Sequence, residues 1–200
     1  AGVYSGLGNS FVDNIINNNG NYGLDTVAGN IFENNTISYN SGFGINTDAG
    51  DTFTNNTIIG NGNFGIDTDT GDFFTLNTVS NNSGWGINTD AGDTFDSNII
   101  ESNYGFGIDT DTGNFFTSNT VSDNYDLGGI NTDAGHTFEL NIVQNNVGFG
   151  INTDTGNFFI ENTVSGNYYY GINTDAGEIF ELNVIESNGS YGINTDTGNS

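Results

Sequence analysis

A unit of 21 residues recurs almost without interruption, and it constrains the fold more than any other feature of the sequence. The clearest copy is 48–68, and its residues define position 1 (Asp48) to position 21 (Thr68) of the repeat. Nine copies fill residues 6–195, and only the copy at 111–132 is one residue longer. A fixed period of this kind is typical of a solenoid, in which each repeat forms one coil and contacts only its neighbours.

Several positions of the unit hold the same residue type in every copy. Position 6 is always Phe, positions 9 and 14 are always Asn, and positions 18 and 19 are Gly followed by Ile or Leu. Paired-helix repeats need about 33 residues or more, and the density of Gly and Asn disfavours helix. Short runs in which apolar and polar residues alternate instead predict three short strands per coil. The fold class is therefore all-β, a parallel β-helix of nine coils.

The same alternation predicts the interior. It should hold Phe at position 6, Ile or Val at position 11, an aromatic residue at position 17, Ile at position 19, Thr at position 21 and a small residue at position 2. Each side chain would stack on its counterpart about 4.8 Å away in the next coil. Asn at positions 9 and 14 predicts two ladders, because a side-chain amide both donates and accepts hydrogen bonds.

The repeat predicts one elongated domain over residues 1–200. Residues 1–5 match positions 17–21 and residues 196–200 match positions 1–5, so two half-coils flank the complete coils of 6–195. One sheet should therefore have one strand more than the others. Neither half-coil resembles a cap, and open strand edges favour end-to-end stacking of identical subunits.

The charge of the chain excludes several classes of partner. The sequence contains 25 acidic residues and neither Lys nor Arg, which gives a formal net charge of −25. Without a cationic side chain it is not expected to bind nucleic acid or an anionic membrane surface. It also lacks an apolar run long enough for direct membrane insertion. The absence of every trypsin-type cleavage site suits an extracellular or cell-surface protein.

The pattern Asn-x-Ile-x-x-Asn-x-x-x-Gly-Ile at 56–66 resembles the right-handed parallel β-helix superfamily, the pectate-lyase-like fold. The resemblance implies right-handed coils over nearly the whole chain. Many members are polysaccharide lyases or hydrolases, and others are adhesins or tailspikes. The Lys or Arg base of the lyases is absent here. The Asn-Thr-Asp triplet of the polygalacturonase-like members recurs in many coils without its Asp-Asp, Gly-His-Gly or Arg-x-Lys partners. We therefore predict a structural or adhesin-type member that is not an enzyme.

Aspartate forms columns at positions 1, 4 and 20 that no basic residue offsets. Like charges one strand spacing apart repel by roughly 1 kcal/mol even in water, and Ca²⁺ with its preference for oxygen ligands would relieve this repulsion. Alternatively, each Asp simply caps a tight turn. The candidate calcium ligands are Asp48, Asp51, Asp67, Asp69, Asp72, Asp90, Asp93, Asp109 and Asp111.

Three other features suggest sites. Asn34 and Asn55, both at position 8, begin Asn-x-Thr triplets and are candidate glycosylation sites. His136, the single histidine, is at position 4 and is expected to be a solvated turn residue. The pair Thr68 and Thr70 recurs in alternate coils and could form a flat ice-binding array.

These features lead to three hypotheses on function. The first is an extracellular structural protein, the subunit of a filament, sheath or surface layer built by self-assembly. The alternative is a calcium-dependent adhesin segment that binds glycans, which an irregular aromatic groove would favour, although the repeat itself does not reveal one. The third is an ice-binding solenoid.

Overall fold

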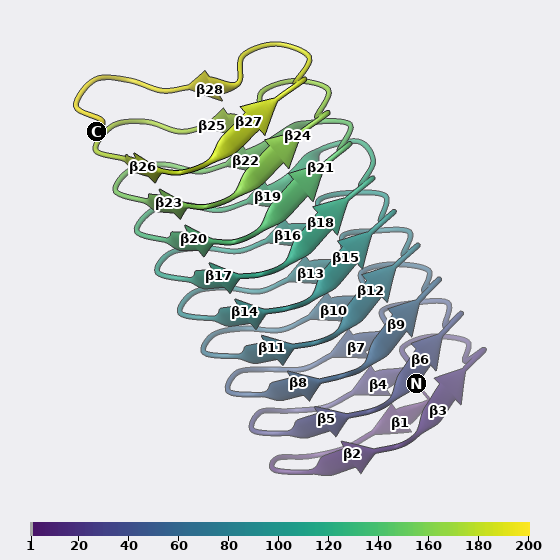
Figure 1. The fold of residues 1–200 in the computed structure, drawn as a ribbon. Coiled ribbons are helices and arrows are strands. Elements are labelled where there is room, and N and C mark those ends of the chain that lie inside the picture. Colours follow the sequence, from purple (N-terminus) through teal and green to yellow (C-terminus); the bar gives the residue numbers. More distant parts are fainter. Residues whose placement is uncertain (1) are drawn as a thin grey trace.

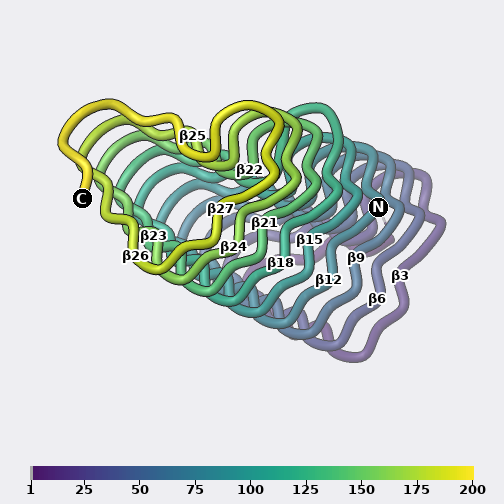
Figure 2. The backbone as a smooth tube through the Cα atoms, turned by 45° about the horizontal axis from the view of Figure 1, so that its top comes forward, coloured from purple at the N-terminus to yellow at the C-terminus, as the bar shows by residue number. Residues whose placement is uncertain are grey.

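A computed structural model describes residues 2–200, and within them the chain forms strands and turns wound into a parallel β-solenoid (Figure 1). The coils stack along one axis from the N-terminal to the C-terminal end (Figure 2). The prediction of a right-handed parallel β-helix, made from the repeat and from the family resemblance, is confirmed. No helix in residues 2–200 has the length and hydropathy needed to cross a bilayer.

Each coil contributes one strand to each of three parallel sheets. The first sheet has ten strands and holds positions 19 and 20 of the repeat: β1 (Val3–Tyr4), β4 (Leu24–Asp25), β7 (Ile45–Asn46), β10 (Ile66–Asp67), β13 (Ile87–Asn88), β16 (Ile108–Asp109), β19 (Gly128–Asn131), β22 (Phe149–Asn152), β25 (Ile172–Asn173) and β28 (Ile193–Asn194).

The second sheet has nine strands and holds positions 5–7: β2 (Ser10–Val12), β5 (Ile31–Glu33), β8 (Thr52–Thr54), β11 (Phe73–Thr75), β14 (Thr94–Asp96), β17 (Phe115–Thr117), β20 (Thr137–Glu139), β23 (Phe158–Ile160) and β26 (Ile179–Glu181). The third sheet also has nine strands and holds positions 10–12: β3 (Ile15–Asn17), β6 (Thr36–Ser38), β9 (Thr57–Ile59), β12 (Thr78–Ser80), β15 (Ile99–Glu101), β18 (Thr120–Ser122), β21 (Ile142–Gln144), β24 (Thr163–Ser165) and β27 (Val184–Glu186). The expected excess of one strand in one sheet is confirmed.

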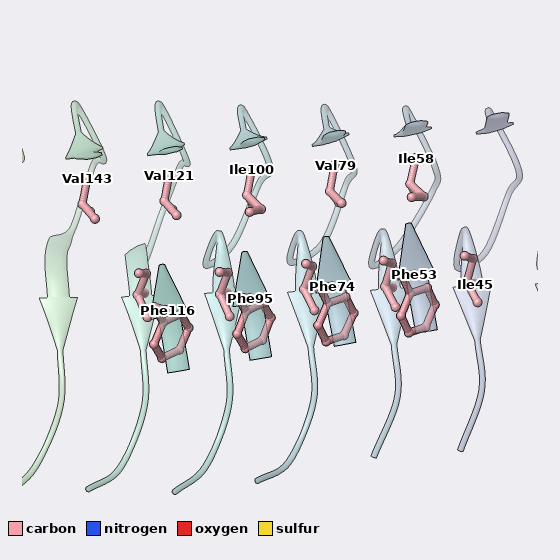
Figure 3. Close-up of a cluster of buried hydrophobic side chains, with 14 of the residues drawn as sticks. Ile45, Phe53, Ile58, Phe74, Val79, Phe95, Ile100, Phe116, Val121 and Val143 are labelled. Atoms are coloured by element: carbon pink, nitrogen blue, oxygen red, sulfur yellow. The ribbon is translucent and has the colours of Figure 1, made fainter. Parts of the chain in front are cut away.

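Register is strict, so residues at the same position of the repeat stack on one another. Phe74 pairs with Phe53 on one side and with Phe95 on the other. The Phe rings of this column are 4.8 Å apart and nearly parallel through the central coils. Beside them run the aliphatic columns of positions 11 and 19 (Figure 3). In the central coils these three columns are fully buried. They form the apolar core, whose burial is the main favourable term in folding.

Three corners join the sheets, and each contains a residue with a left-handed backbone. Position 3 is always Gly, with φ near that of Gly71 at 75°. Positions 8 and 13 take the same conformation, in most copies with a residue other than Gly, for example Leu76 at 58° and Tyr39 at 53°. A side chain in this region is disfavoured, so the packing of adjacent coils must hold these corners in place. The residue after each such corner, at position 4, 9 or 14, points inward.

Two of the predicted interior positions are wrong. The aromatic residues at position 17, such as Phe64, are only partly buried, and Ala49 at position 2 is also partly exposed. For position 17 the reason lies in Gly65 at position 18: a Cβ on it would approach Val79 Cγ1 to 2.5 Å and the Gly86 carbonyl oxygen to 2.6 Å. The backbone itself therefore enters the core at position 18, and the aromatic side chain before it remains on the outer corner. Positions 6, 11, 19 and 21 are interior as predicted.

Candidate functional site

The two predicted Asn ladders are present and fully bonded. In the central coils the Nδ2 atom of each Asn donates to the Oδ1 atom of its counterpart one coil on, as from Asn77 to Asn98 at 3.0 Å. It also donates to a main-chain carbonyl of the preceding coil, as from Asn77 to Phe53 at 2.8 Å. No buried side-chain nitrogen or oxygen in residues 2–200 lacks a hydrogen-bond partner. These Asn residues hold adjacent coils together.

A third ladder, at position 4, was not predicted. Its residues from 30 to 178 are at most 1 % exposed, and the side chain of each accepts the main-chain N–H of its counterpart in the preceding coil. Unlike the Asn ladders it contains mixed residue types: Asn9, Asn30, Asp51, Asp72, Asp93, Asn114, His136, Asn157, Glu178 and Asn199. Each of these side chains places a hydrogen-bond acceptor atom within reach of the main-chain N–H in the preceding coil. The ladder therefore requires an acceptor atom and not one particular residue type.

The residue at position 4 also forms a hydrogen bond with the buried Thr at position 21. The Thr hydroxyl donates to the main-chain carbonyl oxygen of position 1 of its own repeat, as Thr68 does to Asp48 and Thr110 to Asp90. Because a hydroxyl has one hydrogen, a Thr that donates to this carbonyl can only accept from the residue at position 4, whereas an ionised carboxylate at position 4 would compete for that hydrogen. At position 4, the Nδ2 atom of Asn114 donates to Thr110 Oγ1 at 2.9 Å.

The three aspartates of this ladder occupy the place of an Asn. Asp72 Oδ1 accepts the N–H of Asp51 at 2.6 Å, and its Oδ2 lies 2.8 Å from Thr68 Oγ1. Burial raises the pKa of Asp72 from its ordinary value of 3.8 to about 7, although the hydrogen bonds from Asp51 and Thr68 act against this rise. Burial also raises the pKa values of Asp51 and Asp93. A protonated carboxyl at Asp72 would donate to Thr68 as an Asn amide does.

The expectation that His136 is solvated is wrong, because the side chain is fully buried in the position 4 ladder. Its Nδ1 accepts the N–H of Asn114 at 3.0 Å, and its Nε2 lies 2.6 Å from Thr132 Oγ1. The hydroxyl of Thr132 donates to the carbonyl of Asp111 at 2.6 Å, so Nε2 carries the hydrogen of a neutral ring. Burial lowers the pKa of His136 to about 4, which keeps the ring neutral over most of the pH range.

The nine candidate calcium ligands fall into three environments. Asp51, Asp72 and Asp93 lie in the buried ladder, where both oxygens of each carboxyl face protein partners. Half-buried Asp67 and Asp109 at position 20 accept hydrogen bonds from the Asn of the next coil, as from Asn88 to Asp67 at 2.7 Å. The other four are exposed at position 1: Asp48, Asp69, Asp90 and Asp111. No group of three His, Cys, Asp or Glu side chains suited to holding a metal ion occurs in residues 2–200. Calcium binding stays a prediction.

The remaining sequence candidates lie on different parts of the surface. Asn34 and Asn55 are exposed on one corner, where Asn55 Nδ2 donates to Asn34 Oδ1 at 2.8 Å, and their glycosylation also stays a prediction. Thr68 is buried whereas Thr70 is exposed, so this pair does not form the flat array on which the ice-binding hypothesis depended.

The corner between the third and first sheets carries most of the surface aromatic residues. Here, at position 17, two stacks of partly exposed rings run along the axis. The first stack includes Phe64 and Trp85 at 4.8 Å, and the second includes Tyr170 and Tyr191 at 5.6 Å. Tyrosines at positions 15 and 16 extend outward beside the stacks: Tyr104, Tyr125, Tyr168 and Tyr169. We call this surface, positions 13–17 of the central and C-terminal coils, the aromatic corner.

The one-residue insertion lies inside the aromatic corner. The chain at Tyr125-Asp126-Leu127 bulges outward, with Asp126 in a left-handed conformation and the Leu127 N–H donating to the Tyr125 carbonyl at 2.9 Å. Gly128 replaces the ring at position 17, where a Cβ would approach the Phe149 carbonyl oxygen to 2.5 Å. The Asn ladder beside it is unbroken, since Asn124 still bonds Asn146. The insertion therefore changes only the surface.

Two hollows flank the side chains of Tyr104 and Tyr125 and are open to solvent. One of about 390 Å³ is lined by Asn81, Asn82, Ser83, Ser102, Tyr104 and Tyr125. The other, of about 400 Å³, is lined by Tyr104, Tyr125, Asp126 and Val147. Ligand pockets commonly measure roughly 300–1,000 Å³ and combine apolar walls with a few polar groups. A third hollow further along the corner, of about 450 Å³, contains Tyr168 and Tyr169.

Comparisons with known proteins support the fold. No family profile matches the sequence, and no curated protein matches it. Among solved structures, the A-module of the Azotobacter vinelandii mannuronan C-5 epimerase AlgE6 is similar over 90 % of this chain and 62 % of its own, with a TM-score of 0.70 and 15 % identity. The periplasmic alginate epimerase AlgG is similar over 88 % and 61 %, with a TM-score of 0.54 and 17 % identity. ORF18 of Geobacillus virus E2 is similar over 96 % and 52 %, with a TM-score of 0.64 and 12 % identity.

These similarities correct one prediction and leave others as they were. The chain spans about three fifths of the length of the two epimerase structures, and the likeness at such low identity concerns the fold. Because structures so similar in fold include epimerases, the prediction that the chain is not an enzyme is wrong. It depended on missing lyase and polygalacturonase partners, which are only two of the chemistries that this solenoid supports.

Proposed function

We propose that the protein binds a polysaccharide along the aromatic corner, in a location outside the cytoplasm. The observation that carries the proposal is the pair of hollows on either side of Tyr104 and Tyr125. The Tyr104 side chain is 64 % exposed and that of Tyr125 is 48 % exposed. Both residues follow strands of the third sheet, which holds them on a regular scaffold. A phenol ring offers an apolar face with a polar tip, which suits a sugar ring with its apolar C–H face and peripheral hydroxyls.

The polar lining of the hollows supports the same ligand class. Ser83, Ser102 and Asn81 place hydroxyl and amide groups beside the rings. Each of these groups both donates and accepts hydrogen bonds, as sugar hydroxyls do. Tyr104 and Tyr125 belong to neighbouring coils, so they would present successive subsites to an extended chain. The fold likeness to proteins named mannuronan and alginate epimerases is consistent with a polysaccharide ligand.

The test is binding of soluble polysaccharides, measured by titration calorimetry and by affinity electrophoresis. Tyr104→Ala and Tyr125→Ala should each weaken binding roughly tenfold or more, as expected for aromatic anchors. Phe115→Ala is the matched control, because Phe115 is equally exposed, at 56 %, but lies on the second sheet. Loss of binding in the control, or unchanged binding in both tyrosine variants, would contradict the proposal.

End-to-end assembly, the leading hypothesis from the sequence, stays a prediction. It concerns the ends of the solenoid, whereas the aromatic corner lies along its side. The two properties are compatible, because they use different surfaces of the solenoid.

A further inference from the structure

The lining of the first hollow carries no charged side chain. Its walls are Asn81, Asn82, Ser83, Ser102 and the two tyrosines, and the second hollow adds a single carboxylate, that of Asp126. The third hollow is likewise lined only by Gly, Asn, Ser and Tyr residues. A site with such a lining can form hydrogen bonds with hydroxyl groups but cannot neutralise a charge on its ligand.

The surroundings of the hollows are acidic. Asp123 and Asp126 are both exposed on either side of Tyr125, and Glu101 lies half-buried beside Ser102. No Lys or Arg exists anywhere in the chain, and its one histidine is buried. Two like charges 4 Å apart repel by about 1 kcal/mol in water, and at physiological salt charges within about 8 Å still interact. An anionic sugar bound beside Tyr125 would experience this repulsion from the nearby carboxylates.

The same carboxylates favour hydroxyl donors. A hydrogen bond from a hydroxyl to an ionised carboxylate is shorter and about twice as strong as one between neutral groups. Asp126 is exposed beside Tyr125 and Val147 in the second hollow. A sugar stacked on Tyr125 would therefore find an acceptor for its hydroxyls at the edge of the ring.

We infer that the glycan bound at Tyr104 and Tyr125 is an uncharged, hydroxyl-rich polysaccharide and not a polyuronate. This inference rests on the proposed function and specifies its ligand. It separates the chain from the epimerases it resembles in fold, whose names specify mannuronan or alginate, because the chain offers no Lys or Arg to offset the charge of a uronate carboxylate.

The experiment compares polymers of matched length with the wild-type chain, Tyr104→Ala and Phe115→Ala. The probes are a neutral β-glucan, a neutral mannan, mannuronan and, as a cationic polymer, chitosan, each in 150 mM NaCl, which is about physiological ionic strength, with either EDTA or Ca²⁺ present. We expect a neutral polymer to bind the wild type and the Phe115→Ala variant, and Tyr104→Ala to weaken this binding roughly tenfold or more. Mannuronan should bind at least about a hundredfold more weakly in both cation conditions.

The possible failures are distinct. Tyr104-dependent binding of mannuronan, with or without Ca²⁺, at an affinity equal to that of the neutral polymers would overturn the inference and leave the proposed function standing. Tyr104-dependent binding of chitosan alone would also overturn it. If none of the four polymers binds in a Tyr104-dependent way, the proposed function fails together with the inference.

Discussion

Replacing Asp72 by Asn should stabilise the protein at neutral and alkaline pH. In the folded chain Asp72 is fully buried between Asp51 and Asp93, and the exposed Asp48, Asp69 and Asp90 lie at the adjacent turn. No cationic side chain is available to offset an ionised Asp72. Asn114, two coils further along, shows that an amide fits the same set of hydrogen bonds without a proton that can be lost.

The magnitude follows from the pKa. Burial raises the pKa of Asp72 from 3.8 to about 7, so the folded state holds its proton more tightly than the unfolded state does. Stability from this group is fully present below pH 4, declines between pH 4 and pH 7, and is lost above pH 7. At about 1.4 kcal/mol for each tenfold change in proton affinity, the full loss is roughly 4 kcal/mol. The Asn variant should avoid this loss, although Asp51 and Asp93 retain a pH dependence of the same sign.

The assay is urea unfolding between pH 4 and pH 9 at constant ionic strength, followed by the fluorescence of Trp85, the single tryptophan, which lies in the coil between Asp72 and Asp93. The variant should exceed the wild type by roughly 3–4 kcal/mol at pH 9 and by little at pH 4. Asp90→Asn, which removes an exposed charge at position 1, is the control and should not reproduce this dependence. A wild-type stability that does not fall from pH 4 to pH 8, or an equal gain in the control, would refute the reasoning.

Three further predictions concern the core, calcium and assembly. Phe95→Ala, in the stacked column, should cost about 3–5 kcal/mol in chemical denaturation because it leaves a cavity, whereas Phe115→Ala on the outer face should cost less than about 1 kcal/mol; similar losses would contradict the assignment of faces. If the exposed aspartates at position 1 bind Ca²⁺, millimolar Ca²⁺ should raise the melting temperature more than Na⁺ at matched ionic strength, and equal responses would leave only screening. If the coil ends stack, sedimentation velocity should show chains of subunits that persist in high salt, and a monomer at high concentration would exclude this.

The coil could be predicted from the repeat because the positions that pack in the core or form the Asn ladders hold the same residue type in every copy. Phe at position 6 and Asn at positions 9 and 14 each have a single role, so their columns could be assigned without a structure. Position 17 was wrongly placed in the interior because the alternation of inward and outward side chains along a strand was assumed to continue through position 18. The buried Gly65 shows that the backbone there turns into the core, and alternation does not apply across such a turn.

The position 4 ladder was missed for a different reason. Its residues vary between Asn, Asp, His and Glu, and the sequence therefore suggested turn caps, metal ligands and a solvated histidine. The available signal was spacing: positions 4, 9 and 14 are five residues apart, and each follows a left-handed corner. The aromatic corner was also missed, because it depends on the insertion at Tyr125-Asp126-Leu127 and on tyrosines that do not recur in every coil.

The central claim, that the aromatic corner binds a glycan, is tested most directly by backbone-amide NMR during titration with neutral glucan and mannan oligosaccharides. We predict that the shifts of at least one titration concentrate at residues 81–83, 102–104 and 125–127, which contribute to the two hollows or lie directly beside them. They should be small on the second sheet, around Phe73 and Phe115. Shifts confined to the second sheet or to the aspartates of position 1, or no shift with any of these oligosaccharides, would contradict the account.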